Sequence, residues 1–168
     1  MRFVKYILPI IAVAIICTYA YKPVHKYGVF AYLPSATTTT VLTADTFQTI
    51  VGAFDNKAME GFSLQADTTI QYDGHYPNWY EIDWHAATSL NSNGGTVLFA
   101  IRHNGTLDSS SIMGTYLKTA NEIQALSGTA VVYLSYGDKI QLVLTSNDVA
   151  DIVNVEHYTT SIRPFYKY

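Results

Sequence analysis

Three polar side chains that could carry out chemistry alternate along one short segment of the sequence. Glu81, Asp83 and His85 occupy every second position within residues 79–87, and in a strand this spacing places all three on one face. Two carboxylates and an imidazole on one face could bind a metal ion or exchange protons with a substrate. The alternating positions between them are apolar: Tyr80, Ile82, Trp84 and Ala86. We therefore interpret the segment as a strand of a half-buried sheet, and its polar side chains as the solvated face.

The other residues capable of chemistry form no recognisable constellation. His75, His103 and His157 are scattered and lack the spacing of zinc ligands. Asp148 and Asp151 lie three positions apart in an expected loop and could bind calcium with backbone carbonyls, but two acids are too few to predict a site. No serine lies in a Gly-x-Ser-x-Gly turn, and no glycine-rich loop precedes a helix.

These observations predict that the chain is not an enzyme and binds no metal or cofactor. A carbohydrate-acting enzyme would need paired carboxylates in a cleft. The only near pair is Glu81 with Asp83, and strand geometry directs both side chains outward in parallel.

One motif marks both a turn and a candidate modification site. Asn104-Gly105-Thr106 matches the acceptor pattern for N-glycosylation. Asn-Gly is also the strongest short signal for a hairpin, because a type I′ turn needs positive φ at both central residues. We predict a hairpin after residues 96–103, with Asn104 exposed at its tip.

Composition and charge narrow the classes of function. Hydrophobic residues make up 49% of the 168 residues and charged residues 14%, and there are 14 tyrosines, which suit half-buried interfaces. Residues 27–168 contain six basic and thirteen acidic side chains, a net charge of 6 − 13 = −7, so we expect no nucleic-acid binding. The single cysteine, Cys17, excludes an intrachain disulfide. The length suits one domain.

An uncharged segment near the amino terminus predicts a membrane anchor over residues 1–22. Residues 6–21, YILPIIAVAIICTYAY, lie between basic side chains, and with residues 3–5 they could cross a hydrocarbon core of about 30 Å. Two alternatives stay open: a secretory signal cleaved near Thr18-Tyr19-Ala20, or the core helix of a soluble protein. The side chains expected to contact lipid are Tyr6, Ile7, Leu8, Ile10, Ile11, Val13, Ile15, Ile16, Tyr19 and Tyr21.

The remainder of the chain has the rhythm of an all-β sandwich or barrel. Residues 23–46 contain Pro23, Gly28 and Pro34 and are interpreted as a stalk that becomes a strand near residues 39–42. Residues 47–168 are the predicted domain, because strand-forming runs alternate with turn signals about every ten positions. Further strands are expected over residues 47–54, 68–72, 79–87, 96–103 and 158–165, with a looser polar stretch over 108–121.

Residues 127–144, SGTAVVYLSYGDKIQLVL, hold two apolar runs around a Tyr-Gly-Asp corner and are interpreted as a hairpin. This stretch resembles the penultimate hairpin of the complement globular-head and tumour necrosis factor (TNF) superfamily. Residues 97–107, VLFAIRHNGTL, resemble its central hairpin, and residues 157–162 its final strand. Residues 61–72, within GFSLQADTTIQYDG, are similar to versions of the domain in phage and other viral structural proteins. The resemblance spans residues 47–165. No collagen-like repeat precedes it.

The resemblance implies a ten-stranded TNF-like jelly roll that associates as trimers through an apolar, tyrosine-rich surface. Val132 and Leu134 would then point into the sandwich. The expected trimer-interface residues are Val131, Tyr133, Tyr158 and Phe165.

These features together predict a membrane-anchored, non-enzymatic viral structural protein, such as a minor capsid, spike or cement protein, located in the virion. Its expected partners are membrane lipid, other copies of itself, and capsid proteins or a host receptor. The alternative is a membrane-bound cytokine-like ligand that binds a receptor, although only five residues precede the apolar segment.

Overall fold

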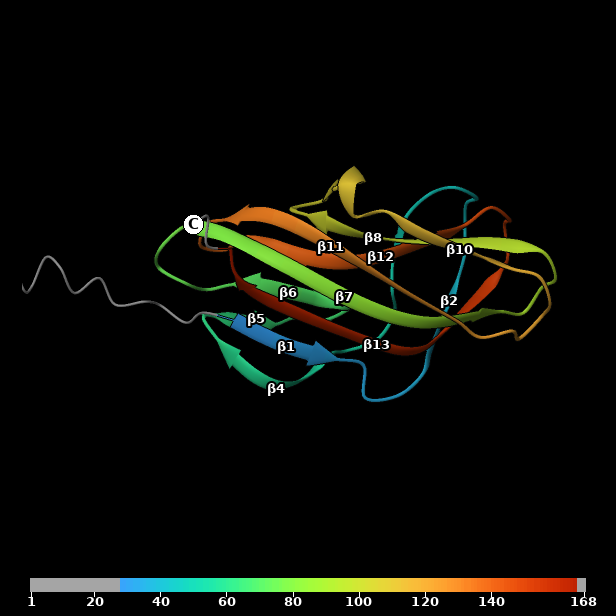
Figure 1. Ribbon diagram of the computed structural model, residues 1–168, viewed down its shortest axis with the longest axis horizontal. Helices are drawn as coiled ribbons and strands as arrows, with labels where there is room; N and C mark the ends of the chain where they lie inside the picture. The colour runs from blue at the N-terminus through green and yellow to red at the C-terminus, as the bar shows by residue number, and fades with distance from the viewer. Residues whose placement is uncertain (1–27, 166–168) are drawn as a thin grey trace, which may run out of the picture.

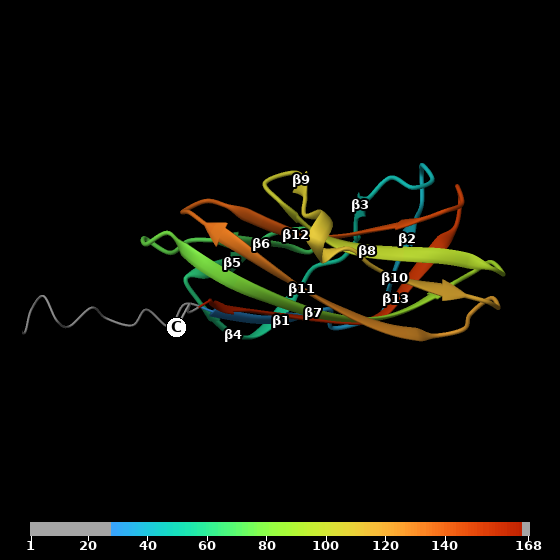
Figure 2. The same ribbon diagram turned by 45° about the horizontal axis from the view of Figure 1, so that its top comes forward.

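The computed structural model describes residues 28–165, excluding the side chains of Lys57 and Ala58, as two packed antiparallel sheets (Figures 1 and 2). Sheet A comprises β1 (Gly28–Tyr32), β2 (Thr37–Thr40), β4 (Asp55–Glu60), β7 (Asn78–Leu90), β11 (Gln124–Leu134) and β13 (Ile152–Pro164). Sheet B comprises β3 (Gln48–Thr49), β5 (Phe62–Leu64), β6 (Thr69–Tyr72), β8 (Gly95–His103), β9 (Thr106–Leu107), β10 (Met113–Leu117) and β12 (Lys139–Ser146). A 3₁₀ helix, η1 (Ser109–Ser111), precedes β10.

The strand order brings segments that are distant in sequence next to each other. Sheet A has the order β11-β7-β13-β1-β4, with β2 also paired to β13, and sheet B has the order β10-β8-β12-β6-β5. The first and last described strands pair antiparallel, with Val29 opposite Ile162. Gly28 and Phe165 therefore lie at the same end of the sandwich, on the left in Figure 1.

Alternation along the strands builds the core between the sheets. In β7, Tyr80, Ile82, Trp84 and Ala86 are buried, whereas the residues between them face solvent at least in part. The Trp84 ring stacks on Phe99 of sheet B with centroids 6.0 Å apart. The half-buried strand predicted over residues 79–87 is confirmed.

The predicted Asn-Gly hairpin is also confirmed. Asn104 and Gly105 have φ angles of 48° and 82°, the positive values that a type I′ turn requires. The turn joins β8 to β9, with His103 opposite Thr106.

Three sequence interpretations, of residues 23–46, 47–54 and 108–121, are wrong. Residues 23–46 are not only a stalk, since they contain β1 and β2, and Val29, Ala31 and Val41 lie in the core. The sandwich therefore includes residues well before position 47. Residues 47–54 contain only the two-residue β3, and the supposedly loose stretch 108–121 contains η1 and β10.

Residues 127–144 do not form a hairpin. β11 pairs with β7 in sheet A, and β12 pairs with β8 in sheet B, so the corner at residues 135–138 connects the two layers. Tyr72 of β6 fixes this corner, because its carbonyl accepts a hydrogen bond from Gly137 N (2.8 Å) and its N–H donates to Asp138 O (2.8 Å). The strand pairings and the Tyr72 hydrogen bonds join residues that are far apart in the sequence. The two apolar runs within residues 127–144 therefore did not indicate the sheet to which each strand belongs.

The predicted anchor over residues 1–22 lies outside the described residues. Within residues 28–165, the structure contains no helix with the length and apolar character needed to span a membrane.

Candidate assembly surface on the outer face of sheet A

The outer face of sheet A carries exposed apolar side chains that do not contribute to the core between the two sheets. Along β11, Val132 and Leu134 are buried, whereas Val131 and Tyr133 are 39% and 47% exposed. The inward orientation predicted for Val132 and Leu134 is confirmed. The alternation of these four residues follows from the strand itself, since successive side chains point to opposite faces of a sheet.

Trp79 extends this apolar surface onto the neighbouring strand. It lies opposite Tyr133 in the register, and the two rings meet edge to face with centroids 5.4 Å apart. Phe165 N donates a hydrogen bond to Trp79 O (2.8 Å), and the Phe165 side chain is also exposed. The sequence interpretation did not include Trp79 in the surface, although it has the same parity in β7 as the polar residues Glu81 and Asp83.

Tyr158 does not belong to this surface, and its predicted place in a subunit interface is wrong. Its side chain is 1% exposed, and its ring stacks on Phe54 with centroids 5.4 Å apart. Burial raises the pKa of the Tyr158 hydroxyl above its ordinary value. The alternation of side chains along β13 explains this position, because Tyr158, Thr160 and Ile162 occupy every second position and share the inner face.

The acidic residues of β7 form an ion-pair cluster with β13. Arg163 Nε lies 2.9 Å from Glu81 Oε2, and Arg163 Nη2 lies 3.0 Å from Asp83 Oδ2. The hydroxyl of Thr129 donates to Asp83 Oδ1 (2.8 Å). The hydrogen bond and the charge of Glu81, together with the charge of Asp83, raise the pKa of the Arg163 guanidinium. Each carboxylate is thus engaged by Arg163.

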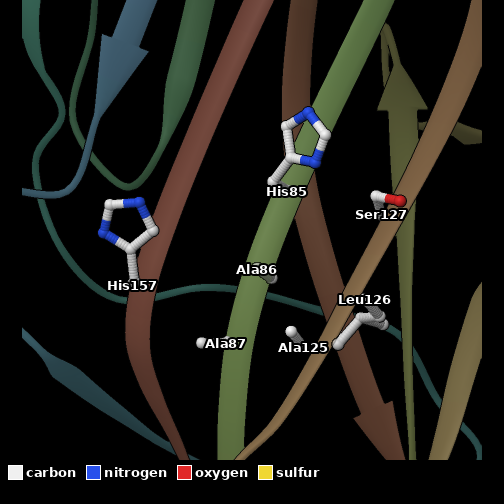
Figure 3. Close-up of a pocket in the computed structure, with 7 residues that line it drawn as sticks. All are labelled: His85, Ala86, Ala87, Ala125, Leu126, Ser127 and His157. Carbon is white, nitrogen blue, oxygen red and sulfur yellow. The ribbon is translucent and has the colours of Figure 1, made fainter.

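A shallow hollow of about 260 Å³ lies farther along the same face (Figure 3). It is lined by His85, Ala86, Ala87, Ala125, Leu126, Ser127 and His157. Figure 3 shows His85 on β7 and His157 on β13, together with Ala87 of β7 and Ala125 of β11. The small side chains in this region would let another backbone or side chain approach the sheet closely.

The candidate calcium ligands have separate surroundings. Asp151 is 5% exposed, and its carboxylate accepts hydrogen bonds from Ser92 Oγ (2.6 Å) and Ser146 Oγ (2.5 Å). Asp148 is exposed. Across the described part of the chain, no three His, Cys, Asp or Glu side chains cluster closely enough to hold a metal ion.

Asn104, the candidate glycosylation site, is exposed, but its side chain also makes structural hydrogen bonds. Its Nδ2 donates to Asp138 Oδ1 (2.7 Å), and its Oδ1 accepts from Lys139 N (2.8 Å). Asp138 Oδ2 also accepts from Ser135 N (2.8 Å) and contacts His103 Nε2 (3.1 Å). Burial acts to raise the pKa of Asp138, but the hydrogen bonds from Ser135, Asn104 and His103 and the His103 charge together lower it. The network joins the β8–β9 turn to the corner between the sheets.

The chain is similar to known proteins in its fold but not in its sequence. No protein-family model and no curated protein matches the sequence. The structure is similar to Eiger TNF from S. frugiperda, with a TM-score of 0.59 and 6% identity over 85% of this chain and 95% of that one. It is also similar to murine APRIL at pH 8.0, with a TM-score of 0.54 and 8% identity over 81% and 98% of the two chains. The described chain has a TNF-like jelly-roll fold.

The same jelly roll is similar to the globular domain of zebrafish complement 1qA protein, with a TM-score of 0.50 and 14% identity over 85% of this chain and 99% of that one. The jelly roll that was predicted from residues 47–165 is confirmed as a fold. Its first strand begins at Gly28, and its sheet A carries the exposed apolar surface.

Proposed function

We propose that this chain is a membrane-anchored, non-enzymatic structural protein whose TNF-like jelly roll forms homotrimers through the outer face of sheet A. In this proposal it serves as a spike, cement or minor capsid protein of a virion, where it mediates assembly or host attachment. The main observation in support of trimer formation is the exposed apolar surface on β7 and β11.

Three neighbouring side chains of that surface support self-association. Trp79, Tyr133 and Val131 are 51%, 47% and 39% exposed, and they adjoin each other through the register of β7 and β11. Contiguous apolar and aromatic patches on a protein surface commonly mark interaction sites, and aromatic side chains are enriched in such interfaces. Another copy of the same face would remove these side chains from water.

The remaining parts of the proposal are supported by the sequence and by the contacts of its charged residues. The uncharged run at residues 6–21 supports attachment to a membrane. The pairing of Glu81 and Asp83 with Arg163 supports a non-enzymatic role, because both carboxylates of this pair are held in ion pairs. The similarity of residues 61–72 to viral structural proteins supports a place in a virion, and this segment forms the β5–β6 hairpin.

A second candidate function is a membrane-bound, cytokine-like ligand that binds a receptor. It is favoured by the structural similarity to Eiger TNF and murine APRIL. The two functions differ in where the protein is found: a structural protein co-sediments with assembled particles, whereas a ligand binds cells in their absence.

Self-association is tested by measuring the solution mass of the detergent-solubilised full chain by light scattering, corrected for detergent, over a concentration series. We expect a trimer of 3 × 18.7 kDa, about 56 kDa. Val131→Glu should yield monomers, because it places a second carboxylate opposite Glu81 in a closed interface, where an unpaired charge costs about 3–5 kcal/mol.

Val149→Glu is the matched control, because Val149 is 62% exposed in the loop between β12 and β13. This variant should remain trimeric. A wild-type chain that stays monomeric over the whole concentration series would contradict the proposed assembly.

A further inference from the structure

Two aromatic loop tips project from the end of the sandwich where Gly28 and Phe165 lie. Tyr76 lies in the loop between β6 and β7, and Tyr136 lies in the corner between β11 and β12. They are 59% and 67% exposed. Figures 1 and 2 show both loops at the end where the described chain begins. We refer to Tyr76 and Tyr136 as the tyrosine tips.

Contacts with a core residue fix the positions of the two loops that hold the tyrosine tips. The hydroxyl of the fully buried Tyr72 donates to Tyr76 O (2.6 Å). The Tyr72 carbonyl accepts from Gly137 N, the residue directly after Tyr136. The Tyr136 ring also stacks on His75 of the other loop, with centroids 6.4 Å apart and planes 5° from parallel. One core residue therefore positions both loops.

The charges near the tyrosine tips determine which kind of lipid surface this end can contact. Asp73 accepts a hydrogen bond from Gln71 Nε2 (2.8 Å), and Asp138 is engaged by the network around Asn104. Lys139, next to the corner, is exposed. The neutral donors stabilise the two carboxylates but leave their charges in place, and Glu60, opposite Gly28, is also exposed. The contact is therefore expected with zwitterionic lipid such as phosphatidylcholine.

The length of the link limits how far this end can lie from an attached membrane. Residues 22–27 separate the uncharged run at 6–21 from Gly28. Seven residue steps, each at most about 3.6 Å, reach no farther than about 25 Å. The polar headgroup layer on each side of a bilayer is about 5–8 Å thick. Gly28 and the neighbouring tips are therefore held within a short distance of the lipid surface.

We propose that the tyrosine tips insert into the headgroup region of the membrane that holds residues 6–21, which orients the jelly roll with this end toward the lipid. The inference rests on the membrane attachment in the proposed function. Tyrosine suits this position because its ring favours the apolar side of the interface while its hydroxyl stays hydrated. The contact restricts the tilt of the jelly roll on its short link.

The test places a tryptophan at one tip of the full chain, reconstituted into phosphatidylcholine vesicles. Tyr136→Trp is made in a Trp79→Phe background, which leaves Trp84 as the other tryptophan, fully buried. The matched control is Leu42→Trp in the same background. Leu42 is 75% exposed and follows Val41, whose N–H donates to Asp151 O at the opposite end of the sandwich.

Quenching is then compared between lipids brominated near the headgroup and iodide in solution. We expect Tyr136→Trp to lose emission to the brominated lipid and to be protected from iodide, and Leu42→Trp to show the reverse. Tyr76→Trp is the second variant if Tyr136→Trp does not fold, and it should behave like Tyr136→Trp.

Each other outcome overturns the inference. If the tip tryptophan is quenched by iodide alone, the tip lies in water. If neither quencher reaches it, another copy of the chain covers it, and if both variants respond equally to lipid, the jelly roll has no fixed orientation. Vesicle flotation separates the two proposals: chains that float without lipid quenching at the tip refute the inference alone, whereas chains that do not float refute the membrane attachment as well.

Discussion

At the scale of single residues, Gly128 shows how closely β11 packs against the core. It lies opposite Trp84 in the register, and a Cβ at this position would lie 2.6 Å from Trp84 Cζ2. The indole is fully buried and stacks on Phe99, so it cannot easily move away. Glycine is required here because of this close approach.

We therefore expect Gly128→Ala to lower the free energy of unfolding by about 1–3 kcal/mol, the usual cost of overpacking a core. The measurement is denaturant unfolding followed by near-ultraviolet circular dichroism. Ser127→Ala changes the preceding, exposed residue and should change stability by no more than about 0.5 kcal/mol. Equal stability of Gly128→Ala and wild type would show that the core has more room than the structure indicates.

Asp138 makes the stability depend on pH. Its pKa is lowered in the folded chain, so the unfolded chain binds more protons as the pH falls. The stabilisation is present above the ordinary aspartate pKa of about 3.9, and is lost as the pH falls through the lower folded value.

We expect Asp138→Asn to cost about 1 kcal/mol at neutral pH, because hydrogen bonds to the carboxylate are weakened. The variant should also lose less stability than wild type on acidification. Unfolding free energies measured between neutral and strongly acidic pH test this difference. Asp148→Asn alters an exposed loop residue and should keep the wild-type pH profile; an unchanged profile in Asp138→Asn would contradict the assignment.

At the scale of elements, β1 and β2 are integral parts of the jelly roll. β1 pairs with both β13 and β4, and β2 pairs with β13. They and the residue that follows each contribute buried Val29, Leu33 and Val41 to the core. Full burial of each such side chain contributes about 1.5–3 kcal/mol, and domains are commonly stable by only about 5–15 kcal/mol.

A fragment that starts at Phe47 should therefore fail to fold cooperatively, whereas one that starts at Tyr27 should fold. Dispersion of backbone amide resonances and the sharpness of thermal unfolding distinguish the two. A cooperatively folded Phe47 fragment would show that β1 and β2 are peripheral to the sandwich.

At the scale of the whole molecule, the two proposals use different surfaces. In the proposed function the outer face of sheet A meets another copy of the chain, whereas in the further inference the tyrosine tips at one end meet lipid. The β7 strand links these surfaces, because the loop that holds Tyr76 leads directly into it and Trp79, near its start, belongs to the apolar surface. Val131→Glu should thus separate subunits without removing the lipid contact, since each chain carries its own tips.

The sequence alone determined the properties that depend on neighbouring residues. Alternation over residues 79–87 gave the strand and its buried face, and Asn104-Gly105 gave the turn, because both follow from local backbone geometry. The order of motifs in residues 97–107, 127–144 and 157–162 resembled a TNF-like jelly roll, and the fold agrees. The assignment of Tyr158 to the subunit interface came from the family resemblance and is wrong, because Tyr158 shares the inner face of β13 with Ile162.

Only the tertiary structure decided which strands pair and what covers each face. It separated β11 and β12 into different sheets, placed β1 beside β13, and paired Arg163 with Glu81 and Asp83. It also brought the β6–β7 loop, which holds Tyr76, and the β11–β12 corner, which holds Tyr136, to the end where β1 begins. These features depend on hydrogen bonds and contacts between residues tens of positions apart, and an apolar alternating run satisfies such contacts equally well in either layer of a sandwich.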